Sequence, residues 1–133
     1  MAKRELTYRG HTAEELQKMS EEEVMRILTA RARRTLKRGL TDQQETLLDR
    51  VRKARAAMPQ KKPIRTHVRD MVILPEFVGL RFAVYNGKEY TEFEVNTEMI
   101  GHYLAEFTYC RRPVKHSAPG VGATRSSLFV PIK

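Results

Sequence analysis

The apolar positions of the first sixty residues recur every three or four places, which is the spacing of helices with one buried face. Three hydroxyl residues, Thr12, Ser20 and Thr41, are each followed three positions later by Glu or Gln, the signature of a helix-starting capping box. The pattern predicts two short helices after the first two boxes, then a basic helical segment that stops at Gly39. A longer helix is predicted from Thr41 to the proline at 59.

After residue 59 the pattern changes to that of extended chain. Prolines at 59 and 63 predict an extended connector that leads into a short strand over 64–68. Residues 80–95 alternate apolar and polar positions around Asn86-Gly87, which predicts a β-hairpin with a two-residue type I′ turn. That turn would pair Phe82 with Thr91, and it would place the apolar side chains of both strands on one face.

The last apolar stripe lies between residues 96 and 107. Its spacing predicts a helix, capped by Asn96 or Thr97, that covers the apolar face of the sheet. The expected fold class is α+β, with a small antiparallel or mixed three-stranded sheet and a packed C-terminal helix. We expect an N-terminal helical extension (1–39), an α+β core domain (40–116) and an extended basic C-terminal tail (117–133).

Charge narrows the range of functions. The 133 residues have room for one ordinary domain and carry a formal net charge of +9, which favours a polyanionic partner, nucleic acid before membrane. No Asp or Glu occurs in residues 30–39, 50–69 or 110–133, so neighbours in the sequence cannot neutralise the basic side chains there. The sequence therefore predicts several clusters available to phosphates.

Other kinds of chemistry find little support in the sequence. Cys110 is the only cysteine, which rules out an intrachain disulfide and a cysteine-based metal site. The start of the chain has no apolar export signal and no stretch is long enough to span a membrane, so we expect a soluble cytoplasmic protein. The four histidines are scattered, and neither the carboxylates nor the serines form a recognised catalytic arrangement. We expect no enzyme activity, no metal and no cofactor.

The tail motif GVGATRSS (120–127) resembles a phosphate-binding loop only superficially. It lacks the lysine of the Walker pattern, and no convincing helix follows it. Two interpretations remain open for this segment: a flexible surface tail, or an extended arm that becomes ordered on a nucleic-acid partner.

Residues 62–107, KPIRTHVRDMVILPEFVGLRFAVYNGKEYTEFEVNTEMIGHYLAEF, resemble the central block of the small-subunit ribosomal protein nineteen family. Gly87, Val95, Gly101 and Phe107 match the family's signature spacing. Two small residues depart from it, Ala105 in place of the common Gly and Cys110 in place of Ser or Thr. The acid-rich N-terminal extension and the tail HSAPGVGATRSS are similar to those of the archaeal and eukaryotic branch, so the resemblance covers essentially the whole chain.

The resemblance implies a structural protein of the small-subunit head in the cytoplasmic ribosome, with a role in translation. Its partners would be the 3′ major domain of the small-subunit ribosomal RNA, small-subunit protein thirteen and elements of the bridge to the large subunit. In this branch the C-terminal arm reaches toward the decoding centre and the A-site transfer RNA. Two alternatives are a free-standing nucleic-acid-binding regulator, using the helix after Thr41 in a groove, and a nuclease, whose metal-binding carboxylates or histidines are missing.

Charge and resemblance together select the candidate contacts. For the tail near transfer RNA they are Gly120, Gly122, Thr124, Arg125 and Ser126. For ribosomal RNA they are Arg31, Arg33, Arg34, Lys37, Arg38, Arg50, Arg52, Lys53, Arg55, Lys61, Lys62, Arg65, Thr66, His67, Arg69, Lys88, Arg111, Arg112, Lys115, His116 and Ser117.

Overall fold

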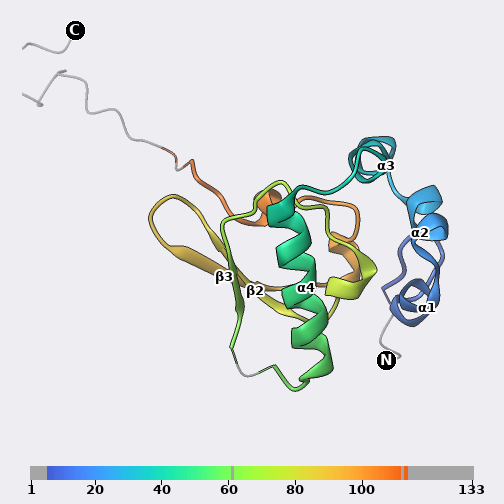
Figure 1. Ribbon diagram of the computed structural model, residues 1–133, viewed down its shortest axis with the longest axis horizontal. Helices are drawn as coiled ribbons and strands as arrows, with labels where there is room; N and C mark the ends of the chain where they lie inside the picture. The colour runs from blue at the N-terminus through green and yellow to red at the C-terminus, as the bar shows by residue number, and fades with distance from the viewer. Residues whose placement is uncertain (1–5, 61, 112, 114–133) are drawn as a thin grey trace, which may run out of the picture.

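The computed structural model describes residues 6–60, 62–111 and 113 (Figure 1). Four helices precede a three-stranded sheet, one short 3-10 turn lies between its first and second strands, and two more follow its third strand. In chain order the elements are α1 (Ala13–Lys18), α2 (Glu21–Ile27), α3 (Ala30–Lys37), α4 (Asp42–Ala56), β1 (Ile64–Thr66), η1 (Pro75–Phe77), β2 (Arg81–Tyr85), β3 (Tyr90–Glu94), η2 (Thr97–Met99) and η3 (Leu104–Phe107). The α+β class predicted from the sequence is confirmed.

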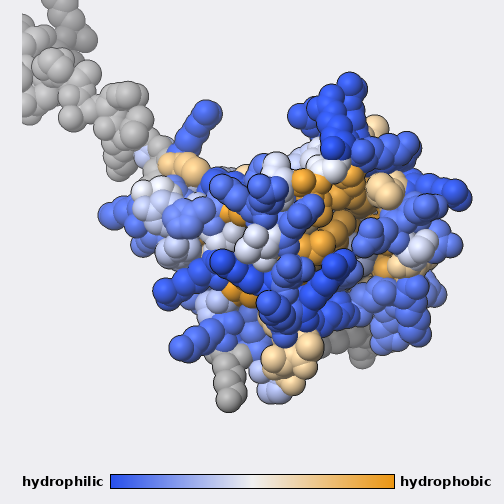
Figure 2. All heavy atoms as spheres, viewed as in Figure 1, coloured by the Kyte–Doolittle hydropathy of each residue, from blue (hydrophilic) through white to orange (hydrophobic). Residues whose placement is uncertain are grey.

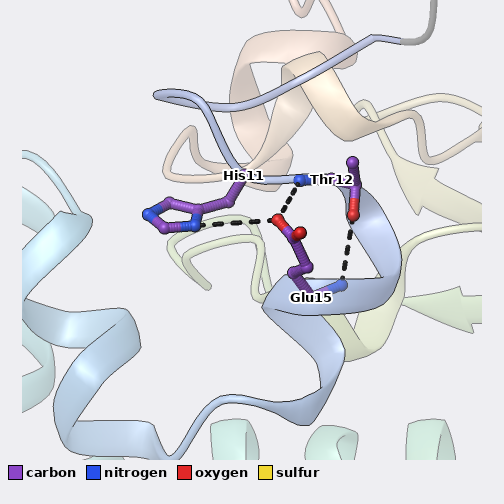
Figure 3. A network of polar contacts seen from close by, with 3 residues as sticks. All are labelled: His11, Thr12 and Glu15. Carbon is purple, nitrogen blue, oxygen red and sulfur yellow. Dashed lines mark hydrogen bonds and ion pairs between the residues drawn. The ribbon is translucent and has the colours of Figure 1, made fainter.

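All three predicted capping boxes start helices. At α1 the Thr12 amide donates to Glu15 Oε2 at 3.0 Å, and the Glu15 amide donates back to Thr12 Oγ1 at 3.4 Å (Figure 3). His11 Nδ1 lies 3.8 Å from the same carboxylate oxygen. Ser20 forms the equivalent box at α2, and at α4 the Thr41 amide donates to a glutamine side chain at 3.1 Å. Each box satisfies helix-terminal N–H groups that have no partner within the helix.

The sheet is mixed, with β1 parallel to β2 and β2 antiparallel to β3. The hairpin register predicted from the sequence is wrong by two residues, because Phe82 pairs with Phe93. Residues 86–89 form a four-residue loop, in which Asn86 Oδ1 accepts hydrogen bonds from the amides of Lys88 and Glu89, both at 2.9 Å. Since a shift of two preserves the alternation of side chains, the apolar face is as predicted.

The main core lies between the sheet, α4 and the turns that follow the strands. Leu47 and Val51 of α4 are buried against Phe82 of β2 and Phe77 of η1, whose rings stack at 5.3 Å. Both phenylalanines have no exposed surface, and burying such a side chain contributes about 1.5–3 kcal/mol. The core thereby fixes α4 over β1 and positions the flanks of both elements at the surface.

The predicted C-terminal helix is not formed. Residues 97–107 contain two 3-10 turns, and Gly101 between them has φ +83°, which interrupts any helix. The backbone of this segment pairs with the chain around Ile73, whose amide donates to His102 O at 2.8 Å and whose carbonyl accepts from the Gly101 amide at 3.0 Å. Ile100 and Leu104 are still buried, so the apolar stripe serves the core without a helix.

The N-terminal helices share a second hydrophobic cluster with the body. Leu16, Val24 and Leu28 pack with Val72 and Ile100. A hydrogen bond of 3.0 Å between the hydroxyls of Thr35 in α3 and Tyr103 also links these helices to the body. In Figure 1 these helices lie on one side of α4 and the hairpin loop lies on the other. None of the described helices is long and apolar enough to cross a membrane.

Candidate nucleic-acid interface

The positive charge stays largely on the surface. Within the described residues, the ion pairs that involve arginine or lysine are both made by Arg52, to Glu21 at 3.5 Å and to Glu76 at 3.6 Å. Exposed pairs of this kind contribute about 0–1 kcal/mol each. The described candidates with exposed side chains are Arg31, Arg34, Lys37, Arg38, Arg50, Arg52, Lys53, Lys62, Arg65, His67, Lys88 and Arg111.

Three of these cations converge beside β1. Arg50 of α4, Lys62 of the connector and Arg65 of β1 line an open depression of about 650 Å³, together with Pro63 and Ile64. The strand supplies this geometry by alternation, because Ile64 and Thr66 point into the core while Arg65 points outward. Since no described carboxylate pairs with any of the three, the depression is a cationic basin that can accept phosphate groups.

Aromatic rings lie next to this basin. The guanidinium carbon of Arg65 lies 5.5 Å from the ring centre of Tyr90, and Tyr90 Oη lies 2.7 Å from His67 Nε2. His67 and Tyr85 have ring centres 4.6 Å apart. Tyr90 and His67 are exposed and Tyr85 is half-buried. Accessible rings beside cations are surfaces on which unpaired bases stack.

Sequence reasoning did not select Tyr85 and Tyr90 as site residues. The signal was present in the alternation of the hairpin, which places both rings on the outward face of the sheet beside Arg65.

Three further predicted contact arginines, besides the ion-paired Arg52, donate hydrogen bonds to backbone carbonyls of the chain. Arg33 donates to backbone carbonyls at the end of α2, at 3.0–3.1 Å. Arg55 donates to Glu76 O at 2.9 Å. Arg69 donates to Tyr85 O at 2.8 Å and to Thr108 O at 2.7 Å, which ties the hairpin to the C-terminal segment. These guanidinium groups position the backbone in the free protein.

The remaining predicted residues fall elsewhere. Thr66 is buried and its hydroxyl accepts from the Val68 amide at 3.0 Å. The exposed cations of α3 lie at the opposite end of the molecule from the hairpin loop (Figure 1), so the predicted contacts form more than one surface. Outside the described residues lie Lys61, Arg112, Lys115, His116, Ser117, Gly120, Gly122, Thr124, Arg125 and Ser126.

In the part of the chain that the structure describes, no group of three or more His, Cys, Asp or Glu side chains could hold a metal ion. At the start of α2, the hydrogen bond from the Ser20 amide, and after it the one from the Ser20 hydroxyl, lowers the pKa of Glu23 below its ordinary value of 4.5. That shift belongs to a helix cap. The described residues around the basin supply cations that can pair with phosphates and rings on which bases can stack.

Sequence comparison with known proteins identifies the family of the chain. The family described as Ribosomal protein S19 matches residues 34–116. Two relatives from strains of Halobacterium salinarum, each named small ribosomal subunit protein uS19, are 54% identical over 129 residues, which cover 97% of this chain and 92% of each relative. The chain therefore belongs to the ribosomal protein S19 family, in its archaeal form.

Proposed function

We propose that this chain binds the small-subunit ribosomal RNA of the head, in its 3′ major domain, as a structural component of the cytoplasmic ribosome and not as an enzyme. One observation carries the proposal: Arg50, Lys62 and Arg65 form a cationic basin that no described carboxylate neutralises, and the rings of His67 and Tyr90 adjoin it. Phosphates would pair with the basin while an unpaired base stacks beside it.

The two kinds of contact respond differently to salt. Phosphate pairing weakens as salt rises because counterions are released on binding, whereas stacking depends little on ionic strength. Base stacking on an aromatic side chain contributes about 1–3 kcal/mol, so its loss should weaken binding by roughly 5-fold to 150-fold. The proposal therefore predicts a ring-dependent part of the affinity that added salt does not remove.

Tyr90 variants test this part of the proposal. The full chain is titrated onto a transcript of the 3′ major domain at several salt concentrations. Tyr90→Leu should weaken binding by at least about fivefold at every salt concentration. The matched variant Tyr90→Phe keeps the ring and should bind within about twofold of the parent. Equal binding by the parent and both variants would refute base stacking at this site.

We further propose that the chain lies beside small-subunit protein thirteen and near the bridge to the large subunit, and that its tail reaches the A-site transfer RNA. The support is the family resemblance and the acid-free composition of residues 110–133. Deleting residues 119–133 should leave assembly of the subunit largely intact and weaken A-site transfer RNA binding. Loss of assembly would instead assign the tail to the scaffold.

A further inference from the structure

A second surface of the molecule is acidic and apolar, in contrast to the cationic basin. Residues 11–25 carry five glutamates against one lysine, in a chain whose net charge is +9. In Figure 2, hydrophobic atoms gather between the body and the N-terminal helices, surrounded by hydrophilic ones. They mark a groove of about 210 Å³, whose apolar lining includes Leu16, Met19, Val24, Leu36, Leu48 and Leu74.

The rim of the groove is acidic. Glu21 of α2, Glu45 of α4 and Glu76 of η1 all line it. Arg52 pairs with Glu21 and Glu76, at 3.5 and 3.6 Å, while Glu45 forms no ion pair with the described residues. Arg55 also donates hydrogen bonds to the Gln17 side chain and to the Glu76 carbonyl at the same groove. The three glutamates of the rim therefore outnumber the neighbouring arginines by one, and Glu45 is the acid that remains available to an incoming cation.

The helix α4 separates the two surfaces. Glu45 faces the groove and Arg50 faces the cationic basin. Five residues apart, they lie about 140° from each other around the helix axis. One helix thus presents acidic and apolar side chains to one side and a basic side chain to the other.

We propose that this acid-rimmed groove receives an apolar side chain from a lysine- or arginine-rich segment of another protein. A cavity of about 150 Å³ holds a benzene ring, so the volume suits one aromatic or branched aliphatic side chain. Flanking cations on the incoming segment would pair with the glutamates of the rim. Such a segment complements both the floor and the charge of the groove, and RNA complements neither. The proposal does not depend on how the cationic basin binds RNA.

Photo-crosslinking in assembled small subunits tests the identity of the occupant. A benzophenone amino acid replaces Met25, which lines the groove, or, as a control, the exposed Glu22, which does not. After irradiation and digestion, mass spectrometry identifies the adducts. We expect position 25 to join a peptide of another protein in which an apolar residue lies among lysines or arginines, at several times the yield from position 22. Adducts to RNA, to this chain's own tail or to an uncharged or acidic peptide, or equal yields at both positions, would overturn the proposal.

Charge reversal tests the acidic rim separately. Glu21→Lys with Glu45→Lys reverses two rim charges, and Glu22→Lys with Asp49→Lys makes the same change in net charge on the same two helices outside the groove. The rim variant should lower the crosslink from position 25 by about 5–10-fold, and the control should leave it within about twofold. Yields are divided by the amount of chain incorporated into subunits, which corrects for poor folding. An equal fall in both variants, or no fall in the rim variant, would contradict a charge-matched segment.

Discussion

Neutralising two cations of the basin should change how RNA binding depends on salt. Lys62 and Arg65 are exposed and have no described carboxylate partner, so replacing both by Gln removes charge without breaking an internal ion pair. Lys18→Gln with Arg26→Gln is the matched control on the N-terminal helices. Both double variants lower the formal net charge from +9 to +7.

The size of the effect follows from counterion release. Each phosphate contact contributes about 0.7–0.9 to the slope of log affinity against log salt, so two lost contacts lower the slope by about 1.4–1.8. One unit of slope is a factor of ten between 1 M and 0.1 M salt. The basin variant should therefore bind about 25–60-fold more weakly than the parent at 0.1 M, and nearly equally when extrapolated to 1 M.

Filter binding to the 3′ major domain transcript, at salt concentrations between 0.05 and 0.5 M, measures the slopes directly. The control variant should keep the parent slope and lose about threefold or less in affinity, because screened charges outside the interface act weakly. The reasoning would be refuted if the basin variant kept the parent slope, or if both double variants lost the same amount. The second outcome would mean that net charge, and not a built site, determines binding.

Three further predictions concern the fold. Gly101→Ala and Gly79→Ala both place a Cβ at positive φ, but of the two only the Cβ at 101 would meet a neighbour, the Tyr8 hydroxyl at 2.9 Å. In urea unfolding, Gly101→Ala should therefore be less stable than Gly79→Ala by about 1–3 kcal/mol. Equal losses of stability would show that this steric clash does not occur. Arg69→Ala should lower the free energy of unfolding by about 2–4 kcal/mol because the Arg69 guanidinium donates to backbone carbonyls, whereas Arg65→Ala should lower it by under about 1 kcal/mol. Similar losses in the two variants would show that Arg69 does not stabilise the fold. The pKa of Glu23 is lowered in the folded chain, so its cap contribution should be complete above pH 4.5 and be lost as the pH falls through the folded pKa; a carboxyl NMR titration with its midpoint at or above 4.5 would contradict this.

Local patterns predicted the elements best. The capping boxes at Thr12, Ser20 and Thr41 were readable because both partners of each box lie within four residues. The hairpin register could not be predicted from the local pattern, because the dipeptide Asn86-Gly87 also suits a two-residue turn. In the structure, Asn86 stabilises a four-residue loop by accepting hydrogen bonds from two amides. A shift of two residues changes every cross-strand pair in the hairpin.

The C-terminal segment shows where periodicity fails. Its apolar stripe has helical spacing, yet its backbone pairs with the chain around Ile73, and Gly101 takes a positive φ. Long-range backbone pairing leaves no trace in the local pattern. Burial of Ile100 and Leu104 was predicted correctly because the core selects apolar positions whichever backbone carries them.

The candidate site was predictable in composition and not in geometry. Arg65 and Arg69 lie four residues apart in the same acid-free stretch, and the sequence gives no sign of their different environments. The structure leaves Arg65 exposed beside Tyr90 and directs Arg69 to backbone carbonyls of distant segments. Which arginine is available to a phosphate therefore depends on the tertiary fold.

The central claim is that charge is segregated across α4, with the cationic basin on one flank and the acid-rimmed groove on the other. Ultraviolet crosslinking of native small subunits tests this claim most directly. RNase and protease digestion followed by mass spectrometry locates nucleotide adducts on the chain. Adducts are predicted within residues 62–69 and 85–90, with none within 11–28. Adducts concentrated within 11–28, with residues 62–69 unmodified, would contradict the account.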